Sequence, residues 1–341
     1  MGLKEYVLYR VLLTPVMLFV LLSFVFILMR VLPGDPITML EGKNIPEEVL
    51  ARRRAELGLD KPLYVQYFDY LYSLFVKRDL GETALERIPV AYLVASRLPA
   101  TIELTVAATL IAAALGIALG LLSARYQYTG VQYFARFYSS VVYSVPVFYL
   151  GLLLQAYLAK PLGFPTTGRL SPVNMVAVDS LPVRTGFVFI DSLAAGRLDI
   201  LLDYLAHISL PALTLGVYLS GVFSRVTYLS VEDAMSQDYT QAARGRGIRE
   251  WTVVKRYGLR NALIPILTMT GLQVAALLGG AVLTETTFNW EGVGLLVYEG
   301  ILKRDYAIVQ GAVTIYAVLV TLTSLVVDVL YAYVDPRVRY E

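Results

Sequence analysis

The sequence predicts an all-helical membrane protein with six transmembrane helices. Hydrophobic residues make up 57% of the 341 residues and charged residues only 16%, which is too few charges for the surface of a soluble domain of this length. The apolar residues gather in runs of about 20, the length that a helix needs to cross a hydrocarbon core roughly 30 Å thick. Composition and the grouping of apolar residues therefore both favour a chain embedded in a lipid bilayer.

The six expected spans follow one another along the chain. The first lies over residues 7–29 and is interrupted only by Arg10. It is too long for a removable signal peptide and lacks the small-residue cleavage site of one. Pro33 and Pro36 end it, because proline cannot continue an α-helix. The other spans are expected over residues 99–123, 137–158, 205–229, 264–286 and 309–333. This divides the chain into residues 1–30, an extracytoplasmic segment 31–98, and a core 99–341.

Basic residues beside the spans predict the orientation of the chain. One side carries most of them, namely Lys4, Arg10, Arg125, Arg136, a loop over about residues 230–263, Arg337 and Arg339. The other side has Lys160, Lys303 and Arg304. Because positive residues accumulate on the cytoplasmic side, both termini are expected in the cytoplasm. In the external segment, Tyr64, Tyr67, Phe68 and Leu71 have the spacing of an amphipathic helix that packs on the membrane or the spans.

The arginine-rich loop 230–263 is the most distinctive segment. Asp238 followed by Gln241 is typical of a capping box that begins a helix, and Gly245 and Gly247 are typical of its end. Such a helix presents Gln241, Ala242 and Ala243 to a partner, and their small side chains permit close approach. In the next helix one strip carries Arg249, Arg256 and Arg260, while Trp251, Val254 and Tyr257 lie across from it. Taken alone, the pattern equally fits an ordinary cytoplasmic loop with a surface helix.

Polar residues inside spans are costly and each needs a reason. Structural pairing near the span ends is the simplest reading of Glu103, Glu285, Arg225 and Asp328. Three glutamines are candidates to line a central pathway: Gln155, Gln273 and Gln310. Gly116 and Gly120 form a small-xxx-small pair that permits close helix packing.

Nine short motifs follow one another along the chain in the order found in a known family of membrane proteins. They are LPGDP (32–36), LGLDKP (57–62), DLG (79–81), PATIEL (99–104), LRNALIP (259–265), GLQV (271–274), LTET (283–286), RDY followed by VQG (304–311) and DPRVR (335–339). Together they resemble the first permease subunit of dipeptide and oligopeptide ABC importers that depend on a binding protein. The loop sequence QAA (241–243), which three further residues separate from Gly247, is similar to the EAA loop of these permeases, with Gln241 in place of its glutamate.

The resemblance implies the type I ABC importer permease fold and a set of partners. These are a second homologous permease, two ATPase subunits, an extracytoplasmic substrate-binding protein and the lipid bilayer of the cell membrane. It also implies that the loop couples to the ATPases through Asp238, Gln241, Ala242, Ala243, Arg244, Arg246, Gly247 and Arg260. Dipeptides or oligopeptides are the implied cargo, with oligosaccharides or a nickel complex as the alternative in the same importer class.

The chain shows no energy-converting chemistry of its own. It has no G-x-x-x-x-G-K-[ST] phosphate loop, so ATP and magnesium are expected in the partner ATPases, and no catalytic or cofactor-binding residue is expected here. It has no cysteine and one histidine, His207, which is a poor basis for a metal site. A net charge of +2 gives no reason to expect nucleic acid.

A second class of function stays open at this point. An ATP-independent secondary carrier or channel is expected to show inverted repeats and ionisable residues at the middle of the membrane. The sequence shows no clear inverted repeat, and its charges within spans lie toward their ends. The importer permease is therefore favoured.

The predicted orientation can be tested by cysteine labelling, since the chain contains no cysteine. Cysteines introduced at Lys43 or Ser171 are expected to react with a membrane-impermeant thiol reagent in intact cells. A cysteine at Gln237 is expected to react only after permeabilisation. Labelling of position 237 in intact cells would contradict the orientation.

Overall fold

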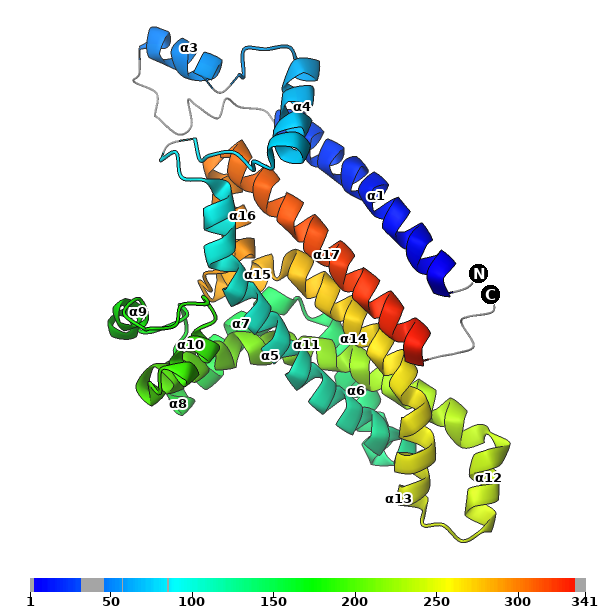
Figure 1. Cartoon of the computed structure of the whole chain (residues 1–341). Helices are drawn as coiled ribbons and strands as arrows, with labels where there is room; N and C mark the ends of the chain where they lie inside the picture. The colour runs from blue at the N-terminus through cyan, green and yellow to red at the C-terminus, as the bar shows by residue number, and fades with distance from the viewer. Residues whose placement is uncertain (1–2, 32–45, 57, 85, 335–341) are drawn as a thin grey trace.

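The computed structural model describes residues 3–31, 46–56, 58–84 and 86–334 (Figure 1). The motifs at 32–36 and 335–339, Lys43, and the side chain of Asp328 lie outside this description. The described chain is helical, with one isolated bridge between Glu82 and Pro89. In order, with η for π-helical segments, the elements are α1 (Leu3–Val31), α3 (Glu47–Glu56), α4 (Leu63–Tyr72), η1 (Ser73–Lys77), α5 (Val90–Arg125), α6 (Gly130–Ser144), α7 (Val147–Leu154), η2 (Gln155–Ala159), α8 (Lys160–Leu162), α9 (Pro172–Val178), α10 (Val188–Ala194), α11 (Leu198–Ser236), α12 (Asp238–Gly245), α13 (Glu250–Val253), η3 (Val254–Leu259), α14 (Arg260–Gly280), α15 (Val282–Thr287), α16 (Val293–Lys303) and α17 (Tyr306–Val334).

Five helical segments of the described chain are long and apolar enough to cross a membrane. They cover Leu12–Arg30, Val90–Arg125, Leu198–Ser236, Glu250–Leu278 and Tyr306–Val327. A bent pair of helices, Gly130–Ser144 and Val147–Leu162, makes a sixth if it is counted as one span. The prediction of an all-helical membrane protein is confirmed.

The span expected over residues 137–158 is not one continuous helix, because the helices Gly130–Ser144 and Val147–Leu162 meet at a bend of 103°. Pro146 causes the break: it has no N–H to donate and it disfavours helical geometry in the residue before it. Val145 accordingly has the extended values φ −83 and ψ 127.

Two further spans begin or end away from their predicted limits. The helix expected from residue 99 begins at Val90, because Val90 and Val94 are buried against α16 and α17. The span expected over 264–286 ends at Gly280, and residues 282–287 form the separate helix α15. At its other end this span continues without a break from Glu250, through η3, into α14.

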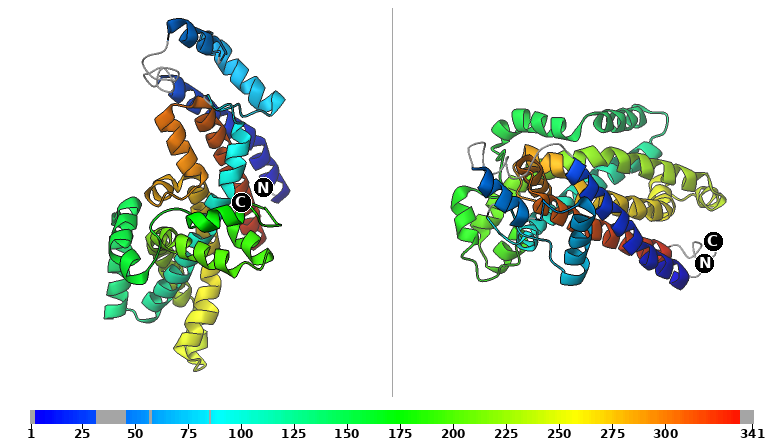
Figure 2. Two further views of the ribbon diagram at one scale, coloured as in Figure 1. Left: turned by 90° about the vertical axis from the view of Figure 1, so that its left-hand side faces the viewer. Right: turned by 90° about the horizontal axis from the view of Figure 1, so that it is seen from above.

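The two ends of the molecule differ in what they carry. α3 and α4 lie beyond one end of α1 and α17, whereas the start of α1, the end of α17 and the α12–α13 hairpin lie toward the opposite end (Figure 1). α8, α9 and α10 also lie far from the hairpin (Figure 2). This arrangement agrees with an even number of crossings between the two termini.

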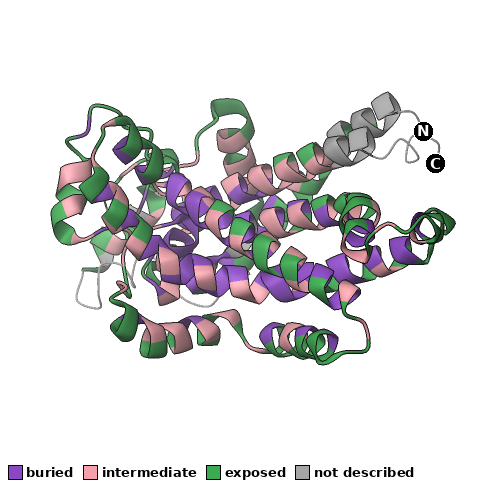
Figure 3. Cartoon of the chain, turned by 90° about the horizontal axis from the view of Figure 1, so that it is seen from below, coloured by how far each residue is buried: buried purple, intermediate pink, exposed green. Residues whose placement is uncertain are grey.

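The centre of the fold is the contact between α5 and α11, around which the buried residues gather (Figure 3). A Cβ at Gly116 would lie 2.3 Å from Cβ of Phe223, and one at Gly120 would lie 2.5 Å from Cβ of Thr227. A Cβ at Gly216 would lie 2.5 Å from Cγ2 of Ile111. The prediction that Gly116 and Gly120 permit close helix packing is confirmed.

Two carboxylates join the helices at a distance from the α12–α13 hairpin. Glu285 is fully buried and accepts hydrogen bonds from Thr101 Oγ1 at 2.8 Å and Leu295 N at 2.9 Å, which ties α15 to α5 and α16. Glu103 pairs with Arg169 and accepts from Phe189 N at 3.0 Å. Structural pairing is thus confirmed for these two. Arg225 is exposed and makes no ion pair with the other described residues.

α4 packs differently from the expected stripe. The rings of Tyr67 and Tyr70 lie 5.2 and 5.7 Å from that of Phe26 on α1. Tyr64 and Phe68 are about two-thirds exposed, at 67% and 65%. Packing against the spans is confirmed for α4, but the contact is made by one edge of the expected stripe and by Tyr70.

The α5–α11 contact predicts a strong position dependence for added side chains. Gly120→Val is expected to lower the free energy of unfolding by about 1–3 kcal/mol, because the new atoms overlap Thr227 and the backbone of Ser224. The control is Gly130→Val, where nothing lies within 4 Å of the added Cβ. The midpoint of thermal unfolding in detergent measures the difference. Equal midpoints for the two variants would count against the close contact.

Candidate coupling loop

The hairpin of α12 and α13 follows directly from the end of α11. Gln237 is extended, with φ −74 and ψ 152, and is the N-cap of α12 without a side-chain capping bond. Asp238 is the first helical residue, where its negative charge is favourable beside the helix N-terminus. The expected capping box at Asp238 and Gln241 is therefore wrong. The start of α12 is held instead by buried Thr240, whose hydroxyl donates to the carbonyl of Gln237 at 2.6 Å and of Met235 at 3.0 Å, and this contact does not cap the free N–H groups of the helix.

The turn between the helices depends on one glycine. Gly247 has φ +74, the left-handed region that glycine adopts at little cost, as the sequence predicted. Its N–H donates to Arg244 O at 2.9 Å, and Ile248 N donates to Ala243 O at 3.3 Å. A Cβ at position 247 would meet nothing within 4 Å. The glycine is therefore required for backbone conformation and not for space.

An ion pair that sequence analysis missed closes the hairpin. Arg244 donates from Nε to Glu250 Oε2 at 3.2 Å and from Nη2 to Oε1 at 2.9 Å. Its Nη1 donates to Met235 O at 3.3 Å, so the same side chain also ties the hairpin to α11. The bond to Glu250 raises the pKa of the Arg244 guanidinium above its ordinary value. Opposite charges on the two sides of a glycine turn were the available signal in the sequence.

The predicted loop residues are not equally exposed. The exposed residues are Asp238, Gln241, Ala242, Arg246, Gly247 and Arg260. Ala243, in contrast, is only 3% exposed and belongs to the buried cluster that contains Val253 and Val254. The expectation that α12 presents Ala243 outward is wrong. Its small side chain serves instead to let α12 lie close to α13 and the end of α11.

The helix after the turn has the two predicted faces. Arg249, Arg256 and Arg260 are exposed, Val254 is buried, and Trp251 and Tyr257 are half-buried. Gly258 lies against α11, since a Cβ there would be 3.0 Å from Cγ1 of Val231. Residues 254–259 are π-helical, a local widening that the sequence did not predict and that often marks functional sites.

The three glutamines do not converge on one site. Gln155 Nε2 donates to the carbonyls of Thr166 at 2.8 Å and Thr287 at 3.2 Å, so it joins η2 to the outer loops. Gln273 is half-buried on α14, and Gln310 is buried near the start of α17. His207 bonds through Nδ1 to the carbonyl of Asp203 at 2.8 Å. No cluster of His, Asp and Glu suited to a metal occurs in the described part of the chain.

Comparison with known proteins identifies the protein family that this chain matches. Residues 116–340 match the family described as binding-protein-dependent transport system inner membrane component, and residues 3–105 match its N-terminal region. The di/tripeptide transport permease DppB of Pseudomonas aeruginosa is 39% identical, with 93% of each chain covered. The dipeptide permease DppB of Escherichia coli K12 is 38% identical over 94% of each chain. The glutathione permease GsiC of Salmonella typhimurium is 35% identical over 99% of each chain.

These matches span nearly the whole chain and agree with the membrane helices and the polar hairpin. The chain therefore belongs to the family of inner membrane components of binding-protein-dependent transport systems.

Proposed function

We propose that the chain is one of two permease subunits of an ATP-driven importer of dipeptides and related short peptides. The names of three relatives, for a di/tripeptide, a dipeptide and a glutathione system, all refer to short peptides. An extracytoplasmic binding protein delivers the cargo, and a second homologous permease completes the pathway. Two ATPase subunits hydrolyse ATP with magnesium. Both termini and the α12–α13 hairpin face the cytoplasm.

Coupling to the ATPases rests on the geometry of the hairpin. Asp238, Gln241, Ala242 and Arg246 have exposed side chains and form the proposed contact with an ATPase subunit. Ala243, Arg244 and Gly247 set the position of α12, through burial, the ion pair with Glu250 and the left-handed turn. Exposed Arg260 extends the contact along the next helix.

The transport pathway is proposed to run beside the faces of the membrane helices that carry amide side chains. Gln273 is half-buried on α14, and its side chain makes no hydrogen bond with the other described residues, so it is free to meet a passing peptide. Gln155 and Gln310 remain candidates for the outer part of the pathway. Gln155 would have to exchange its two carbonyl partners for the cargo.

The left-handed turn provides a matched test of coupling. Gly247→Val is expected to strain the backbone by roughly 1–2 kcal/mol or to reposition α12. Peptide uptake by the reconstituted complex is then expected to fail while membrane insertion is retained. Gly245→Val is the control, because position 245 also has nothing within 4 Å of a Cβ but does not have positive φ. Normal uptake by the Gly247 variant would show that the turn is not required.

The exposed face of α12 provides the second test. Ala242→Trp is expected to reduce both co-purification of the ATPase subunits and peptide-stimulated ATP hydrolysis, since a large side chain prevents close approach. The control is Ala51→Trp, an equally simple change at an exposed position on α3. If the Ala242 variant binds the ATPases and transports peptide as the parent does, this face is not the coupling surface.

A further inference from the structure

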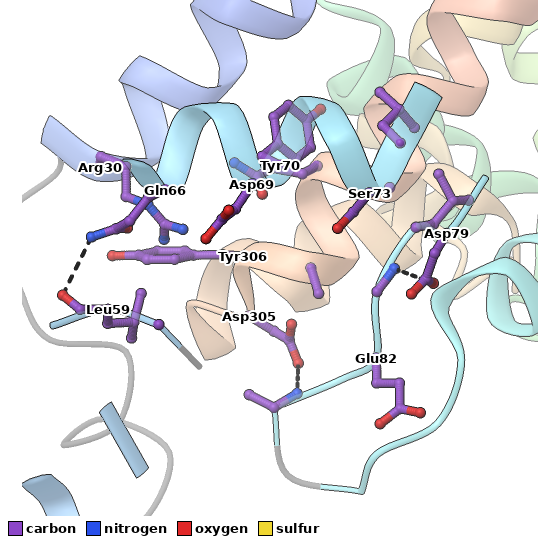
Figure 4. A pocket seen from close by; sticks show the side chains of 18 of the residues that line it. Arg30, Leu59, Gln66, Asp69, Tyr70, Ser73, Asp79, Glu82, Asp305 and Tyr306 are labelled. Carbon is purple, nitrogen blue, oxygen red and sulfur yellow. Dashed lines mark hydrogen bonds between the residues drawn. The ribbon is translucent and has the colours of Figure 1, made fainter. Parts of the chain in front are cut away.

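A polar cavity lies at the outer end of the molecule, away from the hairpin. It has a volume of about 350 Å³, near the lower limit of about 300–1,000 Å³ for small-molecule pockets. Its walls come from the last turn of α1, from α4, from the chain between α4 and α5, and from the start of α17 (Figure 4). Segments far apart in the sequence therefore meet around a space of the size of a small metabolite.

The cavity is lined by hydrogen-bond donors that have no acceptor. Arg30 Nε and Nη1 and Gln310 Nε2 are shielded from solvent and have no hydrogen-bond partner. The guanidinium lies between the rings of Phe26 and Tyr306, at 5.2 and 4.5 Å from their centroids. None of the ion pairs found among the described residues includes Arg30. A largely buried cation without a counter-ion is costly, which favours binding of an anion.

The opposite end of the cavity carries acidic side chains. Asp79 and Glu82 are exposed there, across the cavity from Arg30 and Tyr306 (Figure 4). Asp79 accepts one hydrogen bond, from Gly81 N at 2.9 Å, and keeps acceptor capacity toward the cavity. Asp69, which lies nearer Arg30, is neutralised by Lys61 Nζ at 2.7 Å, and this contact raises the pKa of Lys61. Asp79 and Glu82 thus face the cavity from the side opposite Arg30 (Figure 4).

We propose that this cavity binds a small zwitterion of the size of an amino acid or dipeptide. Its carboxylate accepts hydrogen bonds from Arg30 and Gln310, which turn toward it from their shielded positions. Its ammonium group faces Asp79 and Glu82, and the ring of Tyr306 forms the apolar wall between them. The site is built by α1, α4 and α17, so it depends neither on the coupling role of the hairpin nor on the identity of the transported cargo.

Binding of the dipeptide Ala-Ala to the purified transporter complex, without its binding protein, tests the site. Saturation-transfer NMR with a concentration series gives the affinity. The C-terminal amide of Ala-Ala and the Arg30→Gln variant are each expected to bind at least about tenfold more weakly, the loss typical of a charge-assisted hydrogen bond. N-acetyl-Ala-Ala is expected to bind more weakly because it lacks the ammonium group. Lys160→Gln, an exposed change outside the cavity, is the control.

Gln310→Met keeps the approximate volume of the side chain and removes its amide group, including the unpartnered Nε2 donor, so it tests the site where Arg30→Gln fails to fold. It is expected to weaken Ala-Ala binding while thermal stability stays at the parent value. Unchanged affinity in both variants, or equal binding of the amide, would overturn the carboxylate site. Equal binding of N-acetyl-Ala-Ala would overturn the proposal that the ammonium group of the ligand is recognised. Coupling variants such as Ala242→Trp are expected to leave this binding unchanged, so failure here is distinguishable from failure of the proposed transport function.

Discussion

The close contact of α5 with α11 is the interaction on which the rest of the structure depends. In a bilayer, lipid tails are as apolar as leucine, so helices associate mainly through packing and hydrogen bonds. Glycines at 116, 120 and 216 let the two longest helices meet at distances that no added Cβ would allow. Glu285 fixes α15 and α16 to the same unit through Thr101 of α5 and the backbone of α16.

This central unit also determines where the hairpin lies. α11 continues to Ser236 and holds α12 through Thr240 and Arg244, which both bond to the carbonyl of Met235. On its other side the hairpin leads through α13 and η3 directly into the membrane helix α14, and Gly258 rests on α11. The hairpin is therefore attached twice to the membrane core, and we expect a displacement of α12 to reach both α11 and α14.

Sequence reasoning recovered the features that depend on local composition. Apolar runs identified the spans, and Gly247 was identified as a left-handed position from the residue type alone. Pro146 was a local signal for the break, but the length of the apolar run led to the prediction of one continuous span. The burial of Ala243 and the cavity lined by both Arg30 and Gln310 depend on tertiary contacts between distant segments, so neither had a signal in the sequence. Family resemblance, more than residue physics, led to the prediction of a coupling loop over an ordinary cytoplasmic loop.

We expect the hairpin to move as one rigid unit with α11 when the proposed ATPase partners close. Spin labels on cysteines at Gln241 and at Leu229, both exposed, report the distance between α12 and α11 in this cysteine-free chain. Electron-spin resonance distances in the assembled complex, with and without ATP and vanadate, measure it. One narrow distribution that is the same in both states is the predicted result. A second distance that appears on ATPase closure would show that α12 moves independently of the core, and the account would be wrong.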